Sequence, residues 1–212
     1  MTVGVLDRLV QETRGSDKDW WGPPTGVAHR RQEEVLTAEA WAVSIRTWQP
    51  LTVPGLCQTR EYARALIGKA IGLEPDVMEG RAILRSQRRQ ILSGDDAPRY
   101  AVVLGQAALS EQVGDSRVMR GQIQSLIEMT RAPRATIHIL PSHWGGPGPG
   151  FHLYELPGSV SPIVEVESMI DNRFEENPGE AAAYTKLFAK FLANALDEQE
   201  SVKSLREALA SW

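Results

Sequence analysis

Apolar residues recur with helical spacing over much of the chain. One short amphipathic stretch covers residues 3–10, and a longer one covers residues 28–48, where apolar side chains return every three or four positions. The longer stretch predicts one continuous helix that ends just before Pro50, because proline disfavours a helical residue in front of it. The same spacing predicts further helices beginning at Thr59 and covering residues 75–92, 107–113, 116–130, 184–196 and 202–209.

Four short segments are predicted to be strands. Residues 134–140 alternate between polar and apolar side chains, and residues 100–104 form a short apolar run. Residues 151–156 and 162–167 follow a loop rich in glycine and proline. We therefore expect an α+β fold, in which a small, mostly antiparallel sheet is packed with several helices.

The sequence QPLTVPGLCQT at residues 49–59 interrupts the helical pattern. Pro50 and Pro54 each lack a backbone N–H and push the preceding residue toward an extended conformation. Thr59 then offers a side-chain oxygen to the first turn of a new helix, near which Glu61 complements the helix dipole. The segment is therefore predicted to be a stiff corner between two helices.

The length of the chain is typical of one domain with an appendage. Residues 1–24 are expected to form a short helix and a linker anchored by Trp20 and Trp21, whose turn residues separate it from the main domain at residues 25–212. The two tryptophans are most simply interpreted as a hydrophobic latch.

Composition excludes several classes of function. The net charge is −4 and the C-terminal third is acidic, which argues against a surface that follows nucleic-acid phosphates. No apolar run approaches the roughly 20 residues needed to span a bilayer, and the N-terminus does not resemble a signal peptide, so a cytoplasmic protein without membrane partners is expected. Cys57 is the single cysteine, which excludes an intramolecular disulfide and a cysteine-based zinc site.

The strand patterns place several ionisable side chains on shared faces. Glu165 and Glu167 lie on one face of their strand, roughly 7 Å apart by the rise of a strand. His152 shares a face with Tyr154, and His138 lies on the polar face of residues 134–140. If these faces coincide, they form either a solvated surface or a cleft that binds a cationic or polyhydroxy ligand or transfers protons.

Two further segments have both a plain and a functional interpretation. The loop SHWGGPGPG at residues 142–150, which carries His143 and Trp144, is a long strand connection or a lid over a ligand. The basic run RAILRSQRR at residues 81–89 is a solvated helix face paired with nearby acidic residues, or a surface for an anionic partner. No metal is expected, since no two histidines stand at i, i+2 or i, i+4, and no cofactor motif is present.

The sequence WQPLTVPGLCQTREYARAL at residues 48–66 resembles the signature of a domain of unknown function in actinomycetes. That domain usually follows the helix-turn-helix of XRE-type (Scr-type), antitoxin-like transcriptional regulators. The resemblance continues in order through RRQIL at 88–92, AALSEQVG at 107–114, VMRGQI at 118–123 and TIHILP at 136–141. Glu165 departs from the family pattern, which usually has an aromatic or apolar residue there.

The resemblance implies a domain that acts downstream of DNA recognition. Only about 25 residues precede the long helical pattern, fewer than a helix-turn-helix module requires, so we expect no direct binding to duplex DNA. The first hypothesis is a stand-alone effector domain that binds a small molecule or a partner protein, with a homodimer possible.

The second hypothesis is an enzyme of specialised metabolism that reuses the scaffold for cyclisation, isomerisation or hydrolysis. Its acid–base groups would be Glu165, Glu167 and His152. Under either hypothesis the residues expected to contact the ligand are His138, His143, Trp144 and Tyr154.

Overall fold

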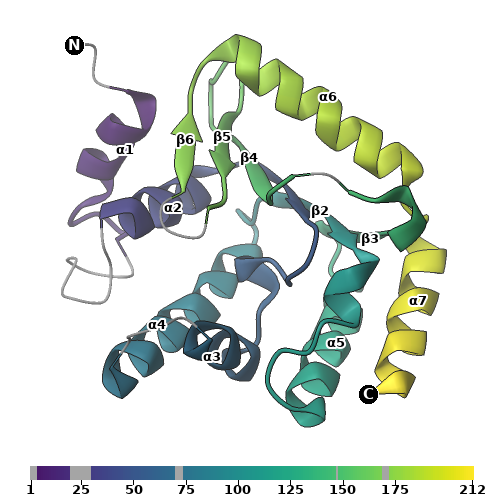
Figure 1. Ribbon diagram of the computed structural model, residues 1–212. Coiled ribbons are helices and arrows are strands. Elements are labelled where there is room, and N and C mark those ends of the chain that lie inside the picture. The colour runs from purple at the N-terminus through teal and green to yellow at the C-terminus, as the bar shows by residue number, and fades with distance from the viewer. Residues whose placement is uncertain (1–3, 20–29, 70–73, 147, 169–171) are drawn as a thin grey trace.

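The computed structural model describes residues 4–19, 30–69, 74–146, 148–168 and 172–212 (Figure 1). Within them lie seven α-helices and one six-stranded sheet, which confirms the α+β class. The helices are α1 (Val5–Thr13), α2 (Arg30–Trp41), α3 (Arg60–Gly68), α4 (Pro75–Arg88), α5 (Ser116–Met129), α6 (Pro178–Asn194) and α7 (Glu198–Ser211). The strands are β1 (Ser44–Gln49), β2 (Arg99–Gly105), β3 (Ala135–Leu140), β4 (Phe151–Glu155), β5 (Ile163–Val166) and β6 (Arg173–Glu175).

The sheet is mixed, with the strand order β3-β2-β1-β4-β5-β6. Strands β3, β2 and β1 run parallel, whereas β1, β4, β5 and β6 pair antiparallel. The prediction of a mostly antiparallel sheet was therefore wrong. Strands β2 and β3 are parallel because helix α5 connects them, and a helical crossover brings consecutive strands into parallel alignment.

Helices cover both faces of the sheet. Phe188 and Phe191 of α6 pack on one face, which we call the α6 face, against Trp48, Val103 and Leu153. The opposite face, which we call the α5 face, packs against α5, α7, the corner at residues 50–58 and part of α2. Figure 1 shows α6 lying across one side of the sheet and α5 with α7 on the other.

The long helix predicted over residues 28–48 is in fact a helix followed by a strand. Helix α2 ends at Trp41, and residues 44–49 form β1, the central strand. Ile45 and Thr47 are β-branched and Trp48 is aromatic, so the segment suits a strand. The corner at residues 50–58 therefore joins a strand to helix α3, not two helices, and Thr59 caps α3 as predicted by accepting a hydrogen bond from Tyr62 N.

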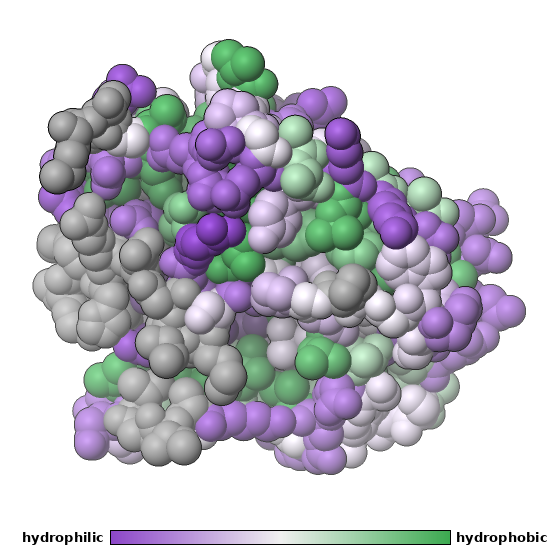
Figure 2. Space-filling model, turned by 45° about the horizontal axis from the view of Figure 1, so that its top comes forward, coloured by the Kyte–Doolittle hydropathy of each residue, from purple (hydrophilic) through white to green (hydrophobic). Residues whose placement is uncertain are grey.

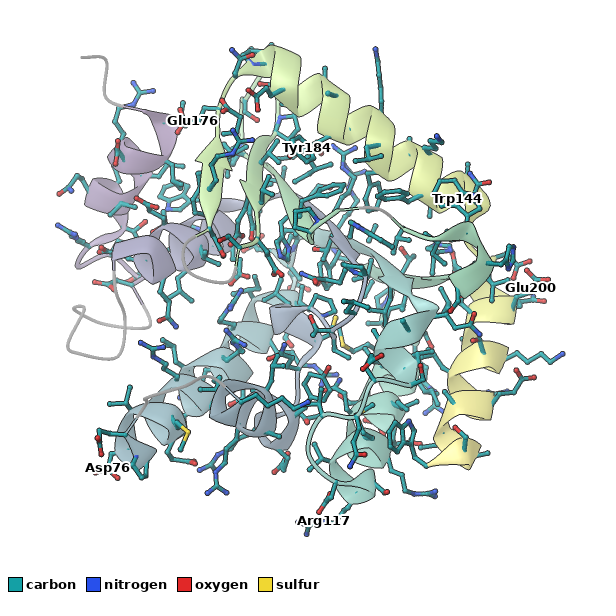
Figure 3. All side chains as sticks on the ribbon, viewed as in Figure 1. Asp76, Arg117, Trp144, Glu176, Tyr184 and Glu200 are labelled. Carbon is teal, nitrogen blue, oxygen red and sulfur yellow. The ribbon has the colours of Figure 1, made fainter. Side chains whose placement is uncertain are left out.

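The N-terminal helix α1 is docked on the main body. The Glu176 carboxylate accepts hydrogen bonds from Val5 N and Leu6 N at 2.8 and 2.9 Å (Figure 3). At the other end of α1, Trp41 Nε1 donates to Thr13 Oγ1 at 2.8 Å. Leu6 and Val10 are buried beneath these contacts. The predicted latch of Trp20 and Trp21 lies outside the described residues.

Candidate functional site

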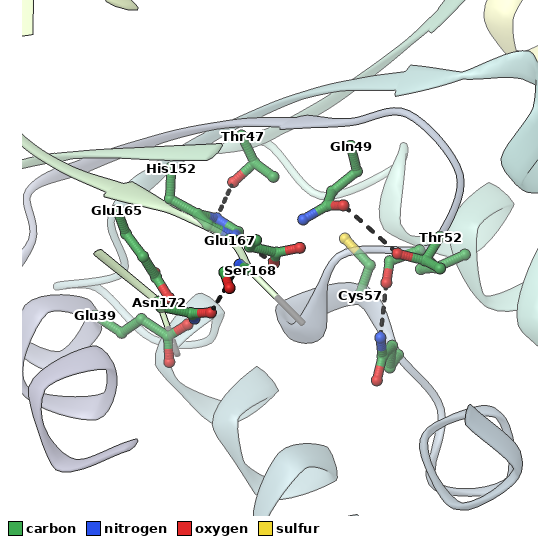
Figure 4. A network of polar contacts seen from close by, with 12 residues as sticks. Glu39, Thr47, Gln49, Thr52, Cys57, His152, Glu165, Glu167, Ser168 and Asn172 are labelled. Atoms are coloured by element: carbon green, nitrogen blue, oxygen red, sulfur yellow. Dashed lines mark hydrogen bonds and ion pairs between the residues drawn. The ribbon is translucent and has the colours of Figure 1, made fainter. Parts of the chain in front are cut away.

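A row of polar side chains crosses the α5 face of the sheet. Thr47 of β1 lies opposite His152 of β4, which lies opposite Glu165 of β5. All three are buried, with exposed fractions of 0%, 5% and 2%. Strand alternation places Gln49, Tyr154 and Glu167 on the same face. The structure thus brings Glu165, Glu167, His152 and Tyr154 onto one face of the sheet. Figure 4 shows the first three of these side chains close together.

His152 is held through both of its ring nitrogens. Nδ1 lies 2.9 Å from Thr47 Oγ1, and Nε2 lies 3.1 Å from Glu167 Oε1. The imidazole also stacks on the ring of Tyr154, with centroids 5.9 Å apart. Burial alone would lower the pKa of His152, but the hydrogen bond to Glu167 and the charges of Glu165 and Glu167 outweigh burial and raise it. The ring therefore favours the protonated form and orients Glu167.

Glu165 is a sequestered carboxyl group. Its Oε2 accepts a hydrogen bond from Tyr154 Oη at 2.5 Å, and its Oε1 accepts one from Asn172 Nδ2. Burial raises its pKa above the ordinary value, and the charge of His152 opposes that rise. With 2% of its surface exposed, Glu165 does not reach solvent and serves to fix Tyr154 and the segment that begins at Asn172.

Glu167 differs from Glu165 because its side chain keeps 36% of its surface exposed. Burial would raise its pKa, but hydrogen bonds with His152 and Gln49 and the charges of His152 and Arg85 lower it to about 2. Because the group is partly solvated, solvent screens these charges and limits their effect on it. Glu167 is thus an ionised, oriented acceptor that points toward solvent.

A groove of about 400 Å³ opens at Glu167. Its lining comes from the end of β1, the corner that follows it, the start of β4 and the segment after β5, and comprises Gln49, Pro50, Leu51, Thr52, Pro149, Gly150, Glu167 and Ser168. It lies at the carboxyl end of β1, where the sheet changes from parallel to antiparallel pairing. Figure 2 shows a face of the molecule that is hollowed near its centre, with hydrophilic residues at the base of the hollow.

Two glycines allow the close packing of the groove's floor and rim. A Cβ on Gly105 would lie 2.3 Å from the carbonyl oxygen of Pro50, so β2 approaches the corner only as glycine. A Cβ on Gly150 would lie 2.6 Å from the Gln49 side chain, which is itself 2% exposed. Side chains at these positions would displace Pro50 and Gln49, and with them the lining of the groove.

A buried ion pair lies beneath the polar row. Arg88 of α4 donates to both carboxylate oxygens of Glu39 on α2, one of them at 2.9 Å from Nε. The two side chains are 10% and 2% exposed. Burial lowers the pKa of Arg88, but the charge of Glu39 and the hydrogen bonds to it raise the pKa well above the ordinary value. The pair joins α2 to α4 below the sheet.

Three residues predicted to contact the ligand lie elsewhere. His138 projects from the α6 face, because β3 pairs parallel with β2 in a register that puts it beside Val103, and its Nδ1 lies 3.0 Å from Leu196 O. His143 is exposed. Trp144 packs edge-on against Phe191 of α6, so it belongs to the core on the far side of the sheet (Figure 3). The polar faces of these strands therefore do not all coincide, because His138 lies on the opposite face of the sheet from His152 and Glu165.

Sequence reasoning also missed several residues of the site. Thr47 and Gln49 were assigned to a helix, so their place beside His152 was hidden. Glu39 and Arg88 are separated by many residues in the sequence, and no local pattern pairs them. Asn172 follows a segment without a periodic signal. The basic run at residues 81–89 was expected to pair with nearby acidic residues. One nearby acidic residue, Glu79, pairs instead with Arg60 and Arg64.

Comparison with protein families places this geometry in context. The family described as "Domain of unknown function (DUF5753)" matches residues 32–207. The chain belongs to this family. The DUF5753 match spans the whole sheet, the polar row and the groove, whereas α1 lies outside the matched residues. No curated protein and no solved structure shows a significant match to the chain.

Three further properties of the DUF5753 chain concern its helices, its possible metal ligands and its cysteine. None of the helices in the described residues is long and apolar enough to cross a membrane. Within the same residues, no group of three or more His, Cys, Asp or Glu side chains is arranged to hold a metal ion. Cys57 is buried, and burial raises the pKa of its thiol to about 12.

The stability of the DUF5753 fold should depend on the protonation of His152. Its pKa is raised above 6.5 in the folded chain, so its contribution is fully present below that pH and is lost as pH rises through the folded pKa. The pKa of Glu165 is also raised, so its contribution to stability is likewise lost as pH rises, beginning at a lower pH. The acidic groups that act on His152 are Glu165, Glu167 and Glu39. The free energy of unfolding, measured with urea at pH about 6 and about 9, should fall between these two pH values by more in the wild type than in His152→Gln. Equal losses would show that His152 stays neutral.

Proposed function

We propose that the chain is an effector domain that binds a small molecule in the groove at Glu167. The observation that carries the proposal is a single oriented carboxylate, held ionised by His152 and Gln49, that faces an open groove. Two of its neighbours, His152 and Gln49, are buried and already satisfied by hydrogen bonds. Such support fixes the orientation of a binding group before the ligand arrives, which lowers the entropic cost of binding.

Binding has more support than acid–base catalysis. A general base works best when its pKa lies near the working pH, whereas hydrogen bonds and nearby positive charges lower the pKa of Glu167 below that of an ordinary carboxyl group. His152 has no free ring nitrogen to offer a substrate, since Thr47 and Glu167 occupy both. Glu165 has the raised pKa of an acid but does not reach the groove. The enzyme hypothesis stays a prediction, and the properties of Glu167, His152 and Glu165 do not favour it.

The lining indicates the class of ligand. Glu167 accepts hydrogen bonds and carries a negative charge, so it suits hydroxyl groups or an ammonium group. Pro50, Leu51 and Pro149 add apolar surface, and Leu51 is 55% exposed. A ligand with hydroxyl or amine donors on a compact apolar body matches this combination.

We further infer that the domain is related to XRE-type, antitoxin-like regulators, on the strength of the sequence resemblance around the corner. The corner at residues 50–58 lines the groove at one end and leads into α3, so the segment that resembles the regulator signature would be the one that senses the ligand. Occupation of the groove would then alter binding to a partner protein in the cytoplasm. Specific binding to duplex DNA is not expected from an acidic chain.

Filling the groove tests the proposal. Thr52→Trp should place a large side chain among the lining residues and abolish binding, whereas Lys203→Trp, on the exposed face of α7, should leave it intact. A fragment library of primary amines and polyols can be screened by ligand-observed NMR against the wild type and both variants. We expect fragments that bind the wild type and Lys203→Trp but not Thr52→Trp. No binding fragment, or equal binding by all three proteins, would contradict the proposal.

A further inference from the structure

Three arginines of α4 lie on one face of the helix, at positions 81, 85 and 88. The three positive charges are not neutralised to the same extent. Arg88 is neutralised by the buried carboxylate of Glu39, with which it forms two hydrogen bonds. Arg85 and Arg81 stand about one and two turns toward the start of the helix and have no ion pair among the described residues.

The guanidinium groups of Arg81 and Arg85 are poorly satisfied. Arg85 Nη1 donates to Gln58 Oε1 at 3.3 Å, a long hydrogen bond to a neutral acceptor. Arg81 Nε is buried and has no hydrogen-bond partner in the described part of the chain. Buried donors are nearly always paired in native proteins, so an unpaired guanidinium nitrogen points to a missing partner.

Electrostatics agree with the geometry. Burial and the repulsion of Arg88 lower the pKa of Arg85 to about 10, while Glu167 and Glu39 only partly offset this effect. Arginine is otherwise protonated under all ordinary conditions. The protein therefore holds a positive charge in a place where its own residues stabilise it poorly.

The nearby carboxylates cannot supply the missing partner. Glu39 is engaged by Arg88, and Glu167 by His152 and Gln49. Glu79, an acidic residue of α4 itself, pairs with Arg60 and Arg64 of α3. Among the described residues, no carboxylate forms an ion pair with Arg81 or Arg85.

We propose that Arg81 and Arg85 form an anion site that binds a carboxylate or phosphate group of a ligand or partner. The planar guanidinium presents donors in a fork that matches both groups. The groove offers an anionic acceptor and this site offers cationic donors, so the two take different ligand groups, although Arg85 and Glu167 act on each other through their charges. The anion site gives the basic run of α4 a role that the groove does not require.

Inorganic phosphate and acetate are the probes for this site. Each is titrated against the full chain at constant ionic strength kept with sodium chloride, with the melting temperature and the Arg Nε–Hε NMR signals as readouts. We expect a saturable rise in melting temperature with one anion or both, and shifts of the Arg81 and Arg85 signals. A response to phosphate alone assigns a phosphoryl group, and a response to acetate alone assigns a carboxylate.

Two variants separate a site from a structural role. Arg85→Gln should weaken anion binding by about tenfold or more and, without anion, should melt no lower than the wild type, because it removes repulsion with Arg88. Arg206→Gln, which changes an exposed arginine of α7, should bind as the wild type does. The proposal is overturned if neither anion gives a saturable response, or if Arg85→Gln responds as strongly as the wild type. The anion titration is read at the Arg81 and Arg85 signals, so failure of the fragment screen at the groove does not decide its outcome.

Discussion

Replacing Glu39 by Gln should lower the free energy of unfolding by about 3–5 kcal/mol, because it leaves Arg88 charged and unpaired beneath the sheet. Both side chains are almost fully buried, at 2% and 10% exposure, so solvent cannot compensate the loss. The expected consequence is a lower midpoint of urea unfolding with an unchanged slope. Circular dichroism measurements of the two proteins at the same pH give both quantities.

The matched control is Glu79→Gln, which removes the acidic partner of Arg60 on the surface. Arg60 and Glu79 are 53% and 35% exposed, and such pairs contribute little, so the unfolding curve should scarcely move. The double variant Glu39→Leu with Arg88→Met should recover much of the stability lost in Glu39→Gln, since it leaves no unpaired charge. A Glu39→Gln protein as stable as the wild type would show that the pair does not hold α2 and α4 together.

The second large effect concerns ligand affinity. Glu167→Gln keeps the shape of the side chain but removes the charge that His152 and Gln49 orient. A hydrogen bond to a charged group contributes roughly 1.5–3 kcal/mol, so a groove ligand should bind the variant about 10- to 100-fold more weakly. Isothermal titration calorimetry with a fragment from the amine and polyol screen measures the change.

The control for this prediction is Glu111→Gln, an exposed carboxylate away from the groove. Its affinity should equal that of the wild type. A Glu167→Gln protein that folds normally and binds the fragment with undiminished affinity would remove Glu167 from the site. Loss of folding in the variant is not expected, because the side chain is partly exposed and the amide oxygen of Gln can still accept a hydrogen bond from His152.

The sequence predicted the acidic side of the site through the two-residue period of strands. Strand alternation predicts that Glu165 and Glu167 share one face of their strand and that His152 and Tyr154 share one face of theirs. The structure shows that both pairs lie on the same face of the sheet. These positions follow from local geometry alone, since alternation within a strand does not depend on the rest of the fold.

The errors arose where long-range packing overrode local pattern. Residues 44–49 continue the helical spacing of α2 by coincidence, yet they form a central strand that is buried on both faces, with Thr47 and Gln49 inside. A strand of that kind has no alternating signature. His138 was misplaced for a related reason, because its face depends on how β3 pairs with β2 and not on its own segment. The pairing of Glu39 with Arg88 likewise has no trace in either local sequence.

The claim that the groove at Glu167 is the ligand site is tested most directly by amide NMR of the labelled chain during titration with a bound fragment. The amides of Leu51, Thr52, Gly150 and Ser168 line the groove and should show the largest shifts. The same shifts should be much weaker at equal fragment concentration in Glu167→Gln. Shifts centred on other parts of the chain, or an unchanged pattern in Glu167→Gln, would contradict the account.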